Sequence, residues 1–241
     1  MFSTTFTSSI IAFAALVSQA EAFWGTAHLL VAREAETLLS DKYPDVLAAA
    51  VTELAVLKQY YPDLVKEGNH PFTECATFAD DIKGQGYSFQ SDWHYINQPY
   101  LDEPGTTLDD FSWTQPTYDV VGAMSDFTKF LKGEISASQS YYVSQIAEKF
   151  SYESDQRSFA LRLIIHYVGD VHQPLHSTTE VDSTYPTSDR GGTAEKIPSK
   201  DGVSSLHFVY DSVLYKYTGR PSLVSILTFH MPLLSSIEKA I

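Results

Sequence analysis

Hydrophobic residues recur along much of this chain at the three- and four-residue spacing that places them on one face of an α-helix. The pattern predicts helices over residues 25–40, from Pro44 onward and over residues 118–132, with a weaker one over residues 139–150. In residues 155–173 the apolar positions run nearly all round the helix. Such a pattern predicts a helix that is buried on every side.

The segments between these helices show no convincing strand pattern. A Pro-rich connection covers residues 97–117, and residues 177–205 are rich in Gly, Ser and Thr. Connections of this length in a compact domain are often functional. We therefore expect an all-α fold, with residues 23–241 forming a single helical domain that carries long functional loops.

Residues 1–22 have the pattern of a signal peptide. Ile10 to Val17 form a short apolar run, and Ala20-Glu-Ala22 is a small-x-small cleavage site that would leave Phe23 as the mature N-terminus. The apolar run is too short to span a bilayer, and no later stretch reaches that length. We expect a protein without stable membrane association that is secreted, or delivered to the lumen of an acidic vacuolar compartment.

The net negative charge of the chain limits how it could bind a nucleic acid. The 241 residues include 16 basic and 30 acidic side chains, a formal net charge of −14. Such a surface repels a polyanion, so a nucleic acid could be held only locally, by bound cations or aromatic stacking. The single cysteine, Cys75, cannot form an intramolecular disulfide, and we expect it to pack as a small apolar residue.

Two pairs of residues carry the first sign of chemistry. His166 and Asp170 are four residues apart, and the same spacing recurs in His207 and Asp211, while His176 closes the first motif. An imidazole and a carboxylate four apart on a helix lie on one face, where both reach one metal ion or two neighbouring ions. One pair alone could be structural, but the repetition favours a metal cluster.

Three further residues are candidate ligands. Asp80 follows an aromatic residue in Ala76-Thr-Phe-Ala-Asp80, His94 lies in Trp-His-Tyr-Ile, and His28 lies close to the expected mature terminus. Imidazole nitrogens and carboxylate oxygens are the donors of hydrolytic zinc sites. Taken singly, Asp80 could instead be a helix N-cap and His94 a histidine of the core.

In this order the motifs resemble the single-strand-specific, zinc-dependent nucleases of the S1/P1 type. The resemblance runs from Phe23 to about Asp211. It rests on the motifs above together with the complete stretch His166-Tyr-Val-Gly-Asp-Val-His-Gln-Pro-Leu-His176 and on Asp-Arg-Gly-Gly. It implies the helical fold that these nucleases share with the bacterial zinc phospholipase C.

The resemblance also implies three zinc ions per chain. Carried over by position, the first would be held by Asp80, His94, His166 and Asp170; the second by Phe23, through its amino nitrogen and carbonyl oxygen, with His28 and a bridging Asp170; and the third by His176, His207 and Asp211. An uncleaved precursor has only an amide nitrogen at Phe23, so removal of the signal peptide would complete the second site.

The activity implied is that of a secreted endonuclease. It would hydrolyse single-stranded DNA and RNA to 5′-phosphorylated products and remove phosphate from 3′-nucleotides, with no protein partner implied. Asp170 would bridge two metals that activate a water, and Asp80 would orient that water. Lys83 would offset transition-state charge, unless it is merely a solvated lysine. Tyr95 would stack on a base, unless it belongs to the core, and Asn97 would read a base edge.

Two alternatives remain open at this point. One is a zinc-dependent phosphodiesterase of the phospholipase C kind; the other is a catalytically silent zinc-binding homologue that is truncated. The second arises because relatives continue in helices well beyond the last ligand, whereas this chain stops at Ile241. We therefore expect residues 212–241 to be an atypical, truncated end.

Overall fold

The computed structural model describes residues 24–218. The predicted signal peptide (residues 1–22), Phe23 and most of the end predicted to be atypical (residues 219–241 of 212–241) lie outside these residues. The described α-helices are α1 (Gly25–Lys42), α2 (Pro44–Tyr60), α3 (Pro71–Glu74), α4 (Phe78–Asp81), α5 (Val120–Leu131), α6 (Tyr141–Ala147), α7 (Glu153–Asp170), α8 (Pro174–Ser177) and α9 (Leu206–Asp211). Short 3₁₀ helices include η1 (Cys75–Thr77), η2 (Lys83–Gln85), η3 (Ser88–His94), η4 (Leu108–Asp110) and η5 (Ala137–Gln139).

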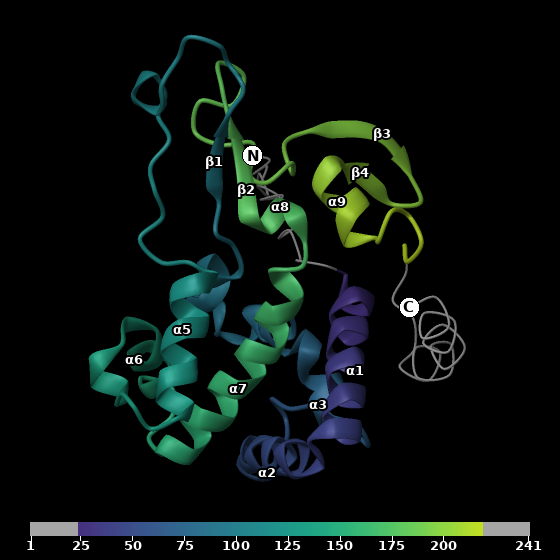
Figure 1. Cartoon of the computed structure of the whole chain (residues 1–241), viewed down its shortest axis with the longest axis vertical. Coiled ribbons are helices and arrows are strands. Elements are labelled where there is room, and N and C mark those ends of the chain that lie inside the picture. Colours follow the sequence, from purple (N-terminus) through teal and green to yellow (C-terminus); the bar gives the residue numbers. More distant parts are fainter. Residues whose placement is uncertain (1–23, 219–241) are drawn as a thin grey trace, which may run out of the picture.

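The helical architecture expected from the sequence is confirmed. Figure 1 shows α7 running through the helical part of the molecule, with α1, α2, α3, α5 and α6 around it and with α8 and α9 beyond its C-terminal end. The predicted helix over residues 155–173 stops earlier than expected, at Asp170. Pro174 explains the stop, because the residue before a proline is disfavoured in the α region, and Gln173 has an extended backbone.

Helix α7 is largely buried because it lies between two hydrophobic clusters, but it is not buried on every side as expected, since Arg157, Leu161, Ile164 and Val168 form a half-buried stripe along it. On one side, Phe159 and Leu163 pack in a cluster with residues of α5 and α6 such as Phe127 and Ile146. On the other side, Ile165 packs with residues of α1 and α2, and Cys75 is buried in that second cluster. Burial raises the pKa of the Cys75 thiol, which favours a packing role over a nucleophilic one.

The expectation that the chain has no strands was wrong in detail. Strands β1 (Gln98–Leu101) and β2 (Thr178–Val181) pair in parallel, and β3 (Lys196–Lys200) and β4 (Val203–Ser205) pair antiparallel. Each strand has at most five residues, and β1 and β3 contain Pro99 and Pro198, which weaken a strand pattern. These pairs order the two long connections on the side of the molecule that carries α8 and α9 (Figure 1).

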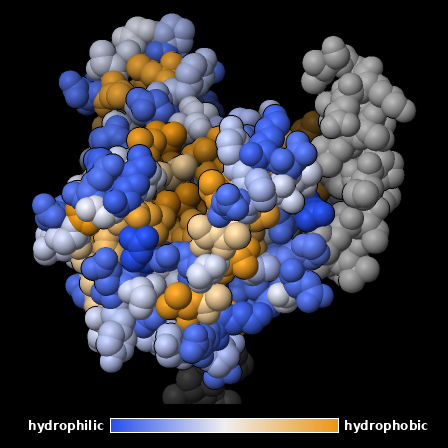
Figure 2. Space-filling model, turned by 60° about the horizontal axis from the view of Figure 1, so that its bottom comes forward, coloured by the Kyte–Doolittle hydropathy of each residue, from blue (hydrophilic) through white to orange (hydrophobic). Residues whose placement is uncertain are grey.

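The surface of the molecule carries both hydrophobic and hydrophilic residues. Hydrophobic residues gather toward the middle of the face drawn in Figure 2, with hydrophilic residues around them. Within residues 24–218 no helix is both long enough and apolar enough to cross a membrane.

Candidate metal centre

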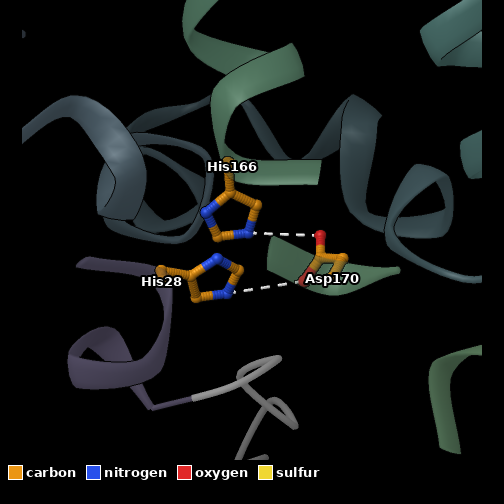
Figure 3. A group of neighbouring side chains, drawn as sticks. All are labelled: His28, His166 and Asp170. Atoms are coloured by element: carbon orange, nitrogen blue, oxygen red, sulfur yellow. Dashed lines mark ion pairs between the residues drawn. The ribbon is translucent and has the colours of Figure 1, made fainter. Parts of the chain in front are cut away.

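The C-terminal end of α7 supplies the central pair of the site. His166 and Asp170 are one helical turn apart and fully buried, and His166 Nε2 lies 3.3 Å from Asp170 Oδ2. Helix α1 brings His28 beside them, and its ring stacks on that of His166 with 3.8 Å between centroids. His28 Nε2 lies 3.5 Å from Asp170 Oδ1, so the two imidazoles approach the carboxylate from neighbouring positions (Figure 3).

Glycine makes this arrangement possible. A Cβ added at Gly169 would lie 2.3 Å from His28 Nδ1, so only a residue without a side chain leaves room for the ring from α1. The motif Gly-Asp before the turn therefore serves packing and chemistry together, since Gly169 admits His28 while Asp170 contacts it.

A second pair of donors comes from α4 and η3. Asp80 and His94 face the end of α7: His94 Nδ1 is 2.8 Å from Asp170 Oδ2, and Asp80 Oδ2 is 3.7 Å from His166 Nε2. Lys83, one turn beyond Asp80, is itself buried and places Nζ 2.7 Å from Asp80 Oδ1. Lys83 is thus not a solvated lysine, and Asp80 lies inside α4 rather than at its N-cap.

A third group lies on the loop-rich side. Helix α9 carries His207 and Asp211, with His207 Nε2 3.4 Å from Asp211 Oδ2, and α8 carries His176, whose ring stacks 5.2 Å from that of His207. His176 also links the groups, because its Nδ1 lies 3.5 Å from Asp170 Oδ1. All three residues are buried.

The sequence-predicted ligands among the described residues therefore assemble in three sets. Within each set, one potential donor atom per residue lies within 4.8 Å of the others: Asp80, His94 and His166; His28, His166 and Asp170; and His176, His207 and Asp211. Phe23 falls outside the described residues.

Main-chain carbonyls orient three of the imidazoles. Nδ1 of His166 lies 2.6 Å from the Ala76 carbonyl oxygen, and Nδ1 of His207 lies 2.7 Å from that of Gly191. Nδ1 of His176 lies 3.0 Å from the carbonyl oxygen of His94. A carbonyl only accepts, so Nδ1 donates and Nε2 keeps the lone pair that a metal needs.

Burial sets the protonation of the site. It lowers the pKa of His28, His94, His166 and His176 well below the usual value, so these imidazoles are neutral. Burial also raises the pKa of Asp170, and the charge of Asp80 adds to that rise. Neutral imidazoles are the ligand form of histidine, and a buried carboxylate of this kind is stabilised as an anion by a cation.

The donor set fits zinc. For a tetrahedral ion with Zn–N near 2.0–2.1 Å, two donors on one ion lie roughly 3.3 Å apart, and the separations of 3.3 Å and 3.4 Å within the His166–Asp170 and His207–Asp211 pairs match this. Among the described residues, Asp170 Oδ1, His176 Nε2 and His207 Nε2 are buried without a hydrogen-bond partner. Buried polar atoms are normally satisfied, so a cation is the expected partner of all three.

The two predicted substrate contacts lie beside the third group. Tyr95 places its ring 4.5 Å from that of His176, and Asn97 has a left-handed backbone with φ of 53° whose N–H donates to the His176 carbonyl at 3.5 Å. Both are half-buried. Burial, with the charges of nearby carboxylates led by Asp170, raises the pKa of Tyr95, so its hydroxyl stays protonated.

Three supporting residues escaped the sequence analysis. Gln90 Oε1 lies 2.7 Å from His94 Nε2, and Gln173 Nε2 donates to Asp211 Oδ1 at 2.8 Å. Asp189 accepts from the Gly192 N–H and so shapes the loop that offers the Gly191 carbonyl to the third group. Gln173 and Asp189 lie inside the motifs that carry the resemblance, with Asp189 at the head of Asp-Arg-Gly-Gly, but those motifs do not say what either side chain contacts. The spacing of Gln90 four residues before His94 was a further signal.

The fold and the site together define a class of protein: a helical domain with buried His/Asp groups able to hold metal ions at the end of a central helix. The chain belongs to the S1/P1 nuclease family, whose model matches residues 23–235. The match extends past Asp211, where the motif resemblance ends.

Curated relatives agree with this assignment. The chain is 27% identical over 200 residues to Endonuclease 5 of Arabidopsis thaliana, covering 79% of this chain and 56% of the relative. It is 26% identical over 195 residues to Endonuclease 2 of the same plant, covering 78% and 55%. The chain thus spans about half the length of the curated relatives it matches.

Proposed function

We propose that this protein is a zinc-dependent nuclease that hydrolyses phosphodiester bonds of single-stranded DNA and RNA to 5′-phosphorylated products and also acts as a 3′-nucleotidase. The observation that carries the proposal is the convergence on Asp170. Both of its carboxylate oxygens are approached by histidine nitrogens, Oδ1 by His28 and Oδ2 by His94 and His166. A carboxylate so placed can bridge two metal ions.

Three zinc ions per chain would be held as the family resemblance implies. The first would take Asp80, His94, His166 and Asp170; the second His28, Asp170 and the Phe23 amine and carbonyl; the third His176, His207 and Asp211. Bound zinc supplies a water of lowered pKa and positive charge for the phosphate oxygens. The grouping of donor atoms within 4.8 Å supports these three sets.

The side chains of the chain then divide the remaining work. Asp80 would orient the attacking water and accept a hydrogen bond from it, because its carboxylate is partly exposed while the other donors are buried. Lys83 would hold Asp80 in place through the 2.7 Å contact and add positive charge near the transferred phosphate. Asp170 would fix the spacing of the paired ions.

The second group needs the start of the mature chain, and two findings support Phe23 in this role. The family match begins at residue 23. Trp24, the next residue, donates its N–H to the Asp211 carbonyl at 3.2 Å, which ties the start of the described chain to the ligand region. Cleavage after Ala22, and with it secretion or vacuolar delivery, belongs to this proposal.

Single strands would be favoured because an unstacked base can lie against an aromatic ring. Tyr95 is the candidate ring and Asn97 the candidate base contact, since both flank His176. The net charge of −14 supports local holding by cations and stacking in place of a basic surface.

The test uses purified protein that begins at Phe23. We expect it to cleave single-stranded RNA and DNA into products with 5′-phosphates, to cleave duplex DNA more slowly, and to lose activity with a chelator. Undiminished cleavage in chelator would contradict the metal mechanism. Hydrolysis of choline phospholipid faster than RNA would instead favour a phospholipase C-like activity, and zinc uptake with no turnover would favour a silent homologue.

A further inference from the structure

Each histidine of a metal site must present one particular ring nitrogen, and the partner of the other nitrogen decides which one. His166, His176 and His207 are oriented by main-chain carbonyls on Nδ1 and present Nε2. His94 is reversed. Its Nδ1 faces Asp170 and His166, and its Nε2 faces the side chain of Gln90.

We propose that Gln90 is a positioning residue that fixes His94 as the Nε2–H tautomer and so keeps its Nδ1 available as a metal donor. This inference rests on the metal site of the proposed function, but it concerns how the chain prepares one ligand and not which substrate is cleaved.

The orientation of the Gln90 amide follows from its surroundings. Its Nε2 lies 2.7 Å from the Ala79 carbonyl oxygen, which can only accept, so the amide NH₂ must be on that side. Oε1 then faces His94 Nε2 at 2.7 Å and receives the hydroxyl of Tyr167 at 3.0 Å. An amide oxygen cannot donate, so the hydrogen of the His94 contact must sit on the ring nitrogen.

This constraint matters because the other side of the ring favours the wrong tautomer. His94 Nδ1 lies 2.8 Å from Asp170 Oδ2, a carboxylate that would readily accept a hydrogen from it. It also lies 3.2 Å from His166 Nε2, which already carries a lone pair. A neutral imidazole has one N–H, and the contact with Gln90 places that hydrogen on His94 Nε2. The lone pairs of His94 Nδ1 and His166 Nε2 and the oxygen Asp170 Oδ2 therefore converge where a cation would lie.

Burial makes the constraint firm. None of the four residues in this network is exposed to bulk water: Gln90, His94, Ala79 and Tyr167 each have 0% exposure. Hydrogen bonds buried in this way are strong, and a lost partner is costly. Gln90 and His94 are four residues apart in η3, and Tyr167 is the neighbour of His166 on α7. The amide, which also contacts Ala79 in α4, therefore ties together the three elements, α4, η3 and α7, that supply Asp80, His94, His166 and Asp170.

The direct test is the tautomer of each histidine in the zinc-loaded mature chain, read by long-range ¹⁵N–¹H NMR on protein labelled at histidine. We expect His94 to show a protonated Nε2, whereas His166, His176 and His207 show a protonated Nδ1. A protonated Nδ1 on His94 would overturn the inference without any variant being made.

Substitutions at Gln90 distinguish a role in positioning His94 from a role in core packing alone. We expect Gln90→Met to change the His94 ¹⁵N pattern and to weaken the tightest zinc binding, measured by chelator competition, about tenfold or more. Gln90→Glu keeps an acceptor for His94 Nε2 and should retain the tautomer. The matched control is Gln156→Met, since Gln156 is also buried and donates to the Phe150 carbonyl, away from the three groups.

The outcomes can be told apart from those of the proposed function. If Gln90→Met and Gln156→Met behave alike in zinc affinity and in the His94 spectrum, the inference is wrong even when the enzyme cleaves RNA. If the tautomers are as expected and no single-stranded substrate is cleaved, the inference stands and the proposed activity fails. If Gln90→Met does not fold, the wild-type and Gln90→Glu spectra still decide.

Discussion

The paired groups around Asp170 and the third group around His207 have similar donors but are held in different ways. His166 and Asp170 project from an 18-residue helix buried between two hydrophobic clusters. His207 and Asp211 lie on a six-residue helix, and His176 on one of four residues. Short helices are marginal by themselves, so local contacts must supply what core packing supplies to α7.

Those local contacts are visible around α8 and α9. Gln173 caps α8 through the Leu175 N–H and also donates to Asp211. The Asp189 carboxylate accepts a hydrogen bond from the Gly192 N–H, and the adjoining Gly191 carbonyl accepts one from His207 Nδ1. The paired donors therefore inherit their geometry from the core, whereas the third group depends on hydrogen bonds within its loops and would depend on the metal that we propose it binds.

The largest effect should come from the residue shared by the paired groups. Asp170→Ala should lower hydrolysis of single-stranded RNA on the order of a thousandfold or more, because it removes a ligand from two ions at once. The zinc content per chain should fall by two. Steady-state kinetics measure the loss of hydrolysis, and metal analysis measures the zinc content. Lys83→Met serves as the comparison, because Lys83 is not proposed as a zinc ligand. Equal, modest losses of activity in the two variants would argue against a bridging Asp170.

A smaller loss is expected from the third group. His207→Ala should reduce hydrolysis on the order of a hundredfold, as for loss of one element of charge stabilisation, and should remove one zinc per chain. The paired ions should stay, because no donor of theirs is touched. Loss of all zinc from this variant would show that the three groups assemble as a unit and that the third group is not supported separately.

Sequence motifs contain the donors of both the paired groups and the third group, although the structural supports of these groups differ. Helical periodicity predicted α7, and the two His-x-x-x-Asp spacings predicted that each pair shares one face of a helix, although a helix over residues 206–211 was not itself predicted. The support of Asp211 by Gln173 could not be foreseen, because that contact joins residues 38 positions apart. Asp189 contacts Gly192 only three residues away, but the adjoining Gly191 carbonyl orients His207, which is 16 residues from Gly191. Strands β1 to β4 were missed for a related reason, since runs of three to five residues are ordered by their partners and not by their own pattern.

Removing zinc should affect the two regions unequally. In chelator, we expect amide hydrogen exchange to rise at least tenfold in α8, α9 and residues 189–192, while amides in the middle of α7 keep most of their protection. The reason is that buried His176 and His207 lose their expected cation partner in a region with little core. Exchange measured by mass spectrometry checks this, and equal loss of protection in α7 would mean that the core also depends on zinc.

The smallest expected effect tests whether the loop around Gly191 supports zinc binding at the third group. Gly191 and Gly202 both have positive φ, 58° and 84°, so alanine at either position costs about 1 kcal/mol of backbone strain. Only at Gly191 does an added Cβ meet main chain, 2.2 Å from the Leu175 carbonyl oxygen, whereas nothing lies within 4 Å at Gly202. Gly191→Ala must therefore displace the carbonyl that orients His207, and we expect zinc at the third group to bind about tenfold more weakly. Gly202→Ala should lose similar backbone stability and bind zinc normally. Chelator competition on the two variants measures the difference, and equal zinc affinities would mean that His207 needs no support from its loop.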